Sequence, residues 1–155
     1  MDAKVTWQEG LSFTGTSDTG FELKLGDKEA GFRPMQLFAI ALAGCTAMDV
    51  ISILEKKREQ VTKFEVKVHA ERATKHPKVF TSARIEYIVS GYDIAEIAVL
   101  RSIELSATRY CPAHAMFVQV FPIELGYSIY EDQGESGRKL VKSGTCSHNR
   151  EPASG

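Results

Sequence analysis

The first 25 residues alternate between hydrophobic and polar positions. Apolar side chains at Val5 and Trp7 are separated by polar ones, and similar spacing returns over residues 11–13 and 21–25, after a polar turn at 18–20. Successive side chains of a strand point to opposite faces, so this pattern predicts short strands joined by turns. We expect an N-terminal β-meander.

Residues 37–54 are almost wholly apolar and break this alternation. Pro34 precedes them and fits the first turn of a helix, where its missing N–H is not needed. We therefore predict a long central helix from Pro34 to Glu59. A helix that is apolar on all sides is normally buried on all sides, and in so short a chain complete cover calls for a second subunit.

The same segment is long enough to cross a membrane, since about 18 residues at about 1.5 Å each reach ~27 Å. Asp49 lies inside it, and Gly44, Thr46 and Ser52 dilute its apolar character. A charged residue in the middle of a membrane span is unfavourable. We expect a buried core helix and no membrane partner.

Alternation of period two begins again at Thr62, where apolar residues alternate with polar and charged ones as far as Glu71. A turn at residues 76–78 and a second apolar segment ending at Gly91 follow. This is the pattern of two antiparallel strands with one buried face. We predict a long β-hairpin.

Helical spacing returns over residues 94–110, and Pro112 then interrupts it. Because proline is tolerated in a helix's first turn, Cys111 is expected at a break or at a fresh helix start. Residues 123–130 are expected to form the last strand. Residues 132–155 are polar and rich in Gly and Ser, so we predict a flexible tail after a single α+β domain over residues 1–131.

Composition supports one soluble globular domain. The chain has 155 residues, and its 19 basic against 20 acidic side chains leave a net charge near zero, which does not favour nucleic acid. No charged-then-apolar leader opens the sequence, so we expect a cytoplasmic protein. In that reducing compartment, the three cysteines are expected to be free, catalytic or metal-bound.

The cysteines are the candidate chemistry. Cys45 lies among small residues of the central helix, where a free cysteine is also a good core residue, and Asp49 one turn on disfavours its thiolate. Cys111 is better placed, because a helix start favours an anion, and His114 could support it. No Cys-x-x-Cys motif accompanies them, so no metal or cofactor is expected. Cys146, in the predicted tail, is treated as incidental.

Residues 34–50 (PMQLFAIALAGCTAMDV) and 104–112 (ELSATRYCP) resemble the OsmC/Ohr family of thiol-dependent peroxide reductases. The resemblance implies an OsmC-like α+β fold in an intertwined homodimer, with buried central helices and active sites at the subunit interface. It also implies that Cys45 reduces organic hydroperoxides, or hydrogen peroxide, and becomes a sulfenic acid. Cys111 then forms a disulfide with Cys45, and an external dithiol restores both.

The sequence departs from the family pattern at two places. The family's peroxidases carry an Arg in the N-terminal strand–loop region and a Glu directly after the helix-start proline. Here residues 14–20 contain no Arg, and Met35 follows Pro34. Arg33 and Arg109 are the available substitutes, and Arg109 is favoured because it lies two residues before Cys111. The alternative is a non-peroxidase relative that binds a small apolar or electrophilic ligand at the dimer interface.

Overall fold

The computed structural model describes residues 1–27, 29 and 31–146. The chain divides into two compact units, Met1–Ile40 and Ala41–Gly155. The first unit holds three antiparallel strands in the order β1 (Ala3–Glu9), β2 (Ser12–Ser17) and β3 (Glu22–Leu25). The predicted N-terminal meander is confirmed.

One helix, α1 (Pro34–Lys56), passes from the first unit into the second. At its start the Gln36 side chain accepts a hydrogen bond from the Arg33 backbone N–H at 2.9 Å, which satisfies a donor that has no partner within the helix. The helix ends three residues before the predicted Glu59, because Arg58 takes a left-handed conformation with φ of 62°. Hydrophobic spacing does not reveal such a terminus at a non-glycine residue.

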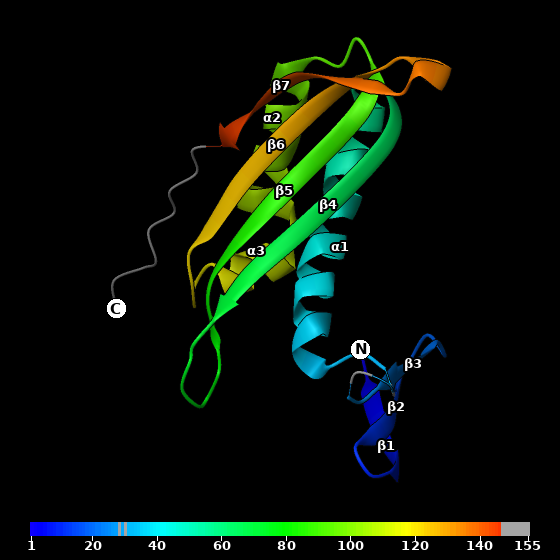
Figure 1. Ribbon diagram of the computed structural model, residues 1–155, viewed down its shortest axis with the longest axis vertical. Helices are drawn as coiled ribbons and strands as arrows, with labels where there is room; N and C mark the ends of the chain where they lie inside the picture. Colours follow the sequence, from blue (N-terminus) through cyan, green and yellow to red (C-terminus); the bar gives the residue numbers. More distant parts are fainter. Residues whose placement is uncertain (28, 30, 147–155) are drawn as a thin grey trace. The chain divides into compact units, whose positions relative to one another are not determined.

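The second unit contains a four-stranded sheet, whose strands are β4 (Gln60–Arg72), β5 (Phe80–Tyr92), β6 (Ile123–Asp132) and β7 (Arg138–Cys146). β4 and β5 form the predicted antiparallel hairpin, and β6 lies parallel to β5. The connection from β5 to β6 holds α2 (Glu96–Leu105), a π-helical turn η1 (Ser106–Tyr110) and α3 (Pro112–Phe117). Figure 1 shows these helices, with α1, on one side of the sheet.

Strand β7 shows that the prediction of a flexible tail from residue 132 was wrong as far as residue 146. β6 continues to Asp132, a short 3-10 turn η2 (Gly134–Ser136) follows, and β7 pairs antiparallel with β6 from Arg138 to Cys146. Nearly all of the β7 residues are exposed, so the strand has no apolar stripe. Backbone hydrogen bonds to β6 define it instead, and a side-chain pattern cannot report them. Residues 147–155 lie outside the described part of the chain.

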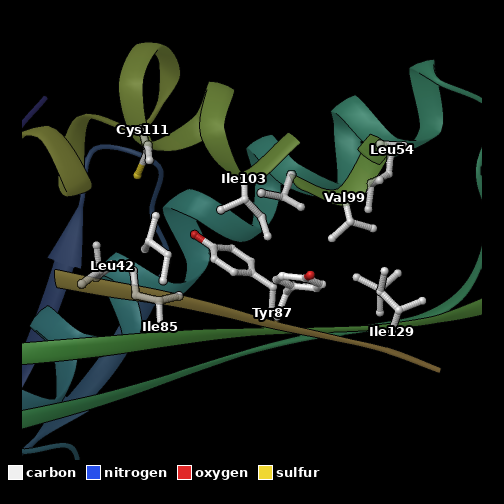
Figure 2. Packing of buried hydrophobic residues seen from close by; sticks show 14 of the residues in the cluster. Leu42, Leu54, Ile85, Tyr87, Val99, Ile103, Cys111 and Ile129 are labelled. Carbon is white, nitrogen blue, oxygen red and sulfur yellow. The ribbon is translucent and has the colours of Figure 1, made fainter. Parts of the chain in front are cut away.

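The core lies between the helices and one face of the sheet (Figure 2). Leu42, Val50 and Leu54 of α1 are spaced to share one helix face and are almost fully buried. They pack in one cluster with residues of β5 and α2, namely Ile85, Tyr87, Val89, Val99 and Ile103. The residues that carry chemistry lie in and beside this cluster.

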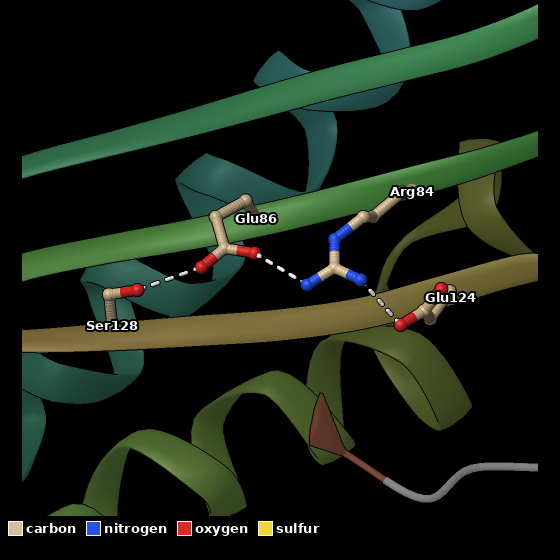
Figure 3. Close-up of polar contacts among 4 residues, drawn as sticks. All are labelled: Arg84, Glu86, Glu124 and Ser128. Atoms are coloured by element: carbon tan, nitrogen blue, oxygen red, sulfur yellow. Dashed lines mark hydrogen bonds and ion pairs between the residues drawn. The ribbon is translucent and has the colours of Figure 1, made fainter. Parts of the chain in front are cut away.

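The other face of the sheet carries charged side chains that pair with one another. Arg84 donates to Glu124 at 2.6 Å and to Glu86 at 3.3 Å, and Ser128 donates to Glu86 at 2.8 Å (Figure 3). Gly126 leaves room for them, since a Cβ there would lie 2.5 Å from a Glu86 oxygen. Partly exposed ion pairs of this kind contribute about 0–1 kcal/mol each, so we interpret this face as a solvated surface.

Helix α1 is long and apolar enough to cross a membrane by length and composition alone. Its polar residues, however, are engaged by the protein itself. The Thr46 hydroxyl lies 2.7 Å from the Tyr87 hydroxyl of the sheet, and Asp49 accepts a hydrogen bond from Ser106. These contacts are those expected of a core helix.

Candidate thiol site

Cys45 lies in the middle of α1, between core residues. Leu42 and Thr46 of the same helix are almost fully buried, whereas Cys45 itself is half-buried at the edge of the hydrophobic cluster. Met48, three residues further along the helix, is 74% exposed. The Cys45 thiol therefore lies where the core meets an apolar surface.

Cys111 occupies the predicted helix break. The π-helical turn η1 closes with a hydrogen bond from the Cys111 N–H to the Ser106 carbonyl at 2.9 Å, and the backbone of Cys111 is then extended. Pro112 begins α3, and the Cys111 sulfur accepts a hydrogen bond from the His114 backbone N–H at 3.3 Å. The sulfur points toward the packed side chains (Figure 2). His114 thus contacts Cys111 through its backbone.

The fold brings Cys45 and Cys111 together. The two residues lie on separate helical segments, yet the Cys45 thiol is close enough to Cys111 to act on its ionisation. Burial raises the pKa of the Cys111 thiol to about 12, and the Cys45 thiol and the Asp49 charge raise it further, against the opposing effect of the His114 N–H. The helix start was expected to favour a thiolate at Cys111, but desolvation outweighs it because Cys111 is only 2% exposed.

A chain of hydroxyl groups runs beside the thiol pair. The Thr46 hydroxyl lies 2.7 Å from the Tyr87 hydroxyl and 2.9 Å from the Ser106 hydroxyl, and Ser106 donates to Asp49 Oδ2 at 3.0 Å. Tyr87, Thr46 and Ser106 are almost fully buried. Sequence reasoning singled out Asp49 but missed its partners; a polar Thr46 inside an apolar helix was the available signal.

The two candidate arginines are exposed. The guanidinium of Arg109 lies over the Tyr110 ring, 5.5 Å from the ring centroid. Arg33 precedes α1 in the first unit, where its backbone contacts Gln36. The structure thus unites the two cysteines and gives Arg109 an aromatic contact at the surface.

Cys146 belongs to the folded unit rather than to a tail. It lies at the end of β7, paired with Leu125, and packs against the hydrophobic cluster. Burial and the charge of Glu86 raise the pKa of its thiol to about 11. Across residues 1–27, 29 and 31–146, no group of three His, Cys, Asp or Glu side chains is arranged to hold a metal ion.

The α+β fold, with one cysteine on a long central helix and the other at a helix break, defines an OsmC-like class of protein. Residues 26–126 match the family model described as OsmC-like protein, and the chain belongs to that family. The resemblance seen in the sequence is confirmed.

Three relatives illustrate the match. The chain is 38% identical over 133 residues to protein YhfA of Escherichia coli K12, covering 83% of this chain and 98% of YhfA. A crystal structure of a hypothetical protein from Aquifex aeolicus VF5 superposes with a TM-score of 0.78 at 25% identity, covering 85% of this chain and 97% of that one. The organic hydroperoxide resistance protein OhrB of Bacillus subtilis shares the fold, with a TM-score of 0.55 at 19% identity over 82% of this chain and 98% of OhrB.

Proposed function

We propose that this protein is a thiol-dependent peroxidase that reduces organic hydroperoxides, with Cys45 as the attacking thiolate and Cys111 as the resolving thiol. The proximity of the two thiols, which come from segments distant along the chain, carries the proposal. Two neighbouring thiols need only a local movement to form a disulfide, whose S–S bond is about 2.05 Å long. Membership of the OsmC-like family, and the name of the OhrB relative, support a peroxide substrate.

The burial of the two cysteines supports this division of roles. Only a thiolate is nucleophilic, and a pKa of about 12 leaves Cys111 protonated at neutral pH. Cys111 is 2% exposed, so a peroxide in solvent cannot reach it directly. Cys45 is half-buried and therefore the more accessible of the pair.

The proposed cycle has three steps, namely attack on the peroxide, disulfide formation and reduction of the disulfide. The Cys45 thiolate attacks the terminal peroxide oxygen, the O–O bond breaks, and the alkoxide takes a proton and leaves as an alcohol, while the sulfur is oxidised to sulfenic acid. The Cys111 sulfur then attacks the Cys45 sulfur, so that an S–S bond forms and water leaves. An external dithiol reduces the disulfide by thiol–disulfide exchange and is itself oxidised to a disulfide.

The working form is proposed to be a cytoplasmic homodimer built on the exposed side of α1. Met48 is 74% exposed, and together with Ala41 and Gly44 it presents apolar and small residues on one helix. Small residues let a second helix approach closely, and burying apolar area stabilises the contact by about 25 cal/mol per Å². The Cys45 thiol would then lie in an apolar interface, which suits an organic hydroperoxide better than hydrogen peroxide.

The proposal is tested by following the consumption of cumene hydroperoxide and hydrogen peroxide with a dithiol reductant. Cys45→Ser should abolish turnover, and Cys111→Ser should stop it after sulfenic acid forms. Cys146→Ser is the matched control and should retain activity. No turnover by the unaltered protein, together with no peroxide-dependent disulfide between residues 45 and 111 in mass spectra, would exclude the peroxidase and leave a ligand-binding relative.

A further inference from the structure

The hydroxyl chain beside the cysteines has a direction. Ser106 donates its proton to Asp49, and a hydroxyl has only one proton, so Ser106 must accept from Thr46. By the same reasoning Thr46 must accept from Tyr87. Burial raises the pKa of the Tyr87 hydroxyl, which therefore keeps its proton and can donate it. All three hydroxyl protons thus point along the chain toward the Asp49 carboxylate.

These hydroxyl groups hold the Asp49 carboxylate beside the two cysteines. Asp49 follows Cys45 by four residues on α1 and so lies on the same side of the helix, one turn away. Ser106, which binds Asp49, also accepts the backbone N–H of Cys111 through its carbonyl. Within the described residues, the Asp49 charge acts on the Cys111 thiol, which follows η1, and on the Tyr87 hydroxyl of β5, while Cys45 lies one turn away on the same helix.

A carboxylate at this place opposes the first step of the cycle, because its charge disfavours a neighbouring thiolate. The second step, in which Cys111 attacks the sulfenic acid, needs a group that can accept and donate a proton. Cys111 still holds its proton when it attacks the sulfenic acid, since burial raises its pKa to about 12. The hydroxide that leaves the Cys45 sulfur needs a proton. A group that takes the proton from Cys111 and gives a proton to the leaving hydroxide would meet both needs of this second step.

We propose that Asp49 is the proton acceptor and donor of the resolving step, a role that rests on the function proposed above. The Cys111 proton passes to the Asp49 carboxylate, directly or through one water, as the Cys111 sulfur attacks the Cys45 sulfur. The S–S bond forms, the S–O bond breaks, and the hydroxide leaves as water with the proton that Asp49 returns. Asp49 ends the step as a carboxylate, and Tyr87, Thr46 and Ser106 orient it throughout.

The substitution Asp49→Asn separates this role from a purely electrostatic one. The amide can still accept the Ser106 hydrogen bond, but it is neutral and takes no proton. If Asp49 acted only through its charge, its loss would lower the pKa of Cys111 and speed disulfide formation. The proposed role requires the opposite result, slower disulfide formation.

The experiment uses a Cys146→Ser background, one equivalent of cumene hydroperoxide, and rapid quenching followed by mass spectrometry. Sulfenic acid, trapped with dimedone in a Cys111→Ser companion, should form at Cys45 at least as fast in Asp49→Asn as in the parent. Disulfide formation at pH 7 should be slower by at least about tenfold, and the difference should shrink as pH rises and hydroxide removes the thiol proton. Asp49→Glu should recover part of the rate, and Glu55→Gln, an exposed position on the same helix, should not alter it.

A second measurement keeps the test independent of peroxide chemistry. A mixed disulfide of Cys45 with thionitrobenzoate is resolved by Cys111 with release of the coloured thiol, and this release should also be slower in Asp49→Asn. Absence of a dimedone adduct in every variant would overturn the peroxidase while this measurement still tested Asp49. Disulfide formation or release as fast in Asp49→Asn as in the parent, or faster, would overturn the role of Asp49.

Discussion

The hydroxyl of Thr46 lies 2.7 Å from the hydroxyl of Tyr87, and this contact joins the central helix to the middle of the sheet. Thr46 follows Cys45 directly, so the contact also fixes the helix turn that carries the thiol. Tyr87 is fully buried, and Thr46 is the side chain that satisfies its hydroxyl group with a hydrogen bond. The polar chain therefore has a structural role beside the chemical one proposed for its last member.

Replacing Thr46 with valine should destabilise the fold. The two side chains have similar shapes, but valine leaves the Tyr87 hydroxyl buried without this partner, which costs about 1–3 kcal/mol. Urea unfolding followed by circular dichroism should show a lower midpoint. Thr46→Ser keeps the hydroxyl and should lose less, and Thr81→Val, at an exposed position of β5, is the matched control. Equal stability of Thr46→Val and the parent would contradict the prediction.

The three reduced cysteines should react with iodoacetamide in a set order. Cys111 and Cys146 have pKa values raised to about 12 and about 11, mainly by burial, so few of their thiols are ionised at pH 7.5. Cys45 should be labelled first. Because a raised pKa moves ionisation to higher pH, labelling of the other two should increase as pH rises from about 9 toward 12. Mass spectrometry of peptides after timed quenching measures all three, and Cys111 labelling as fast as Cys45 would refute this order.

We propose that Arg109 supports the Cys45 thiolate in place of the family's missing arginine. A cation near a thiolate favours the charged form, so Arg109→Ala should lower the rate of Cys45 alkylation at pH 7 severalfold. Arg109→Lys should restore part of it, and Arg33→Ala tests the other candidate. Arg101→Ala, an exposed arginine paired with Glu104, is the control. An unchanged rate in both Arg109→Ala and Arg33→Ala would remove arginine support from the site.

A charge on the exposed side of α1 should separate the proposed dimer. Met48 is 74% exposed in the single chain, so Met48→Lys should leave the fold of one subunit intact. In a dimer the lysine would be buried without a partner, which is strongly unfavourable. Light scattering after size-exclusion chromatography should report half the mass. Ile97→Lys, at a 78% exposed site on α2, should keep the original mass. A parent that is already monomeric would contradict the dimer.

Local patterns were enough to predict most of the secondary structure. The alternation before residue 25, the hairpin and the helix from Pro34 all follow from the period of their side chains. The prediction failed where the backbone alone determines the end of a helix or the formation of a strand. Arg58 ends α1 through a positive φ, and β7 forms by pairing with β6 while its side chains stay exposed.

The thiol site was also predicted only in part from the sequence. Sequence alone determined the family, because the residues around Cys45 and Cys111 form a specific motif, and it placed Cys111 at a helix break through Pro112. It could not determine how the environment acts on each thiol. Burial is set by packing among segments distant along the chain, so only the tertiary structure showed that desolvation outweighs the helix start at Cys111. For the same reason, only the fold revealed that Tyr87, Thr46 and Ser106 lead to Asp49.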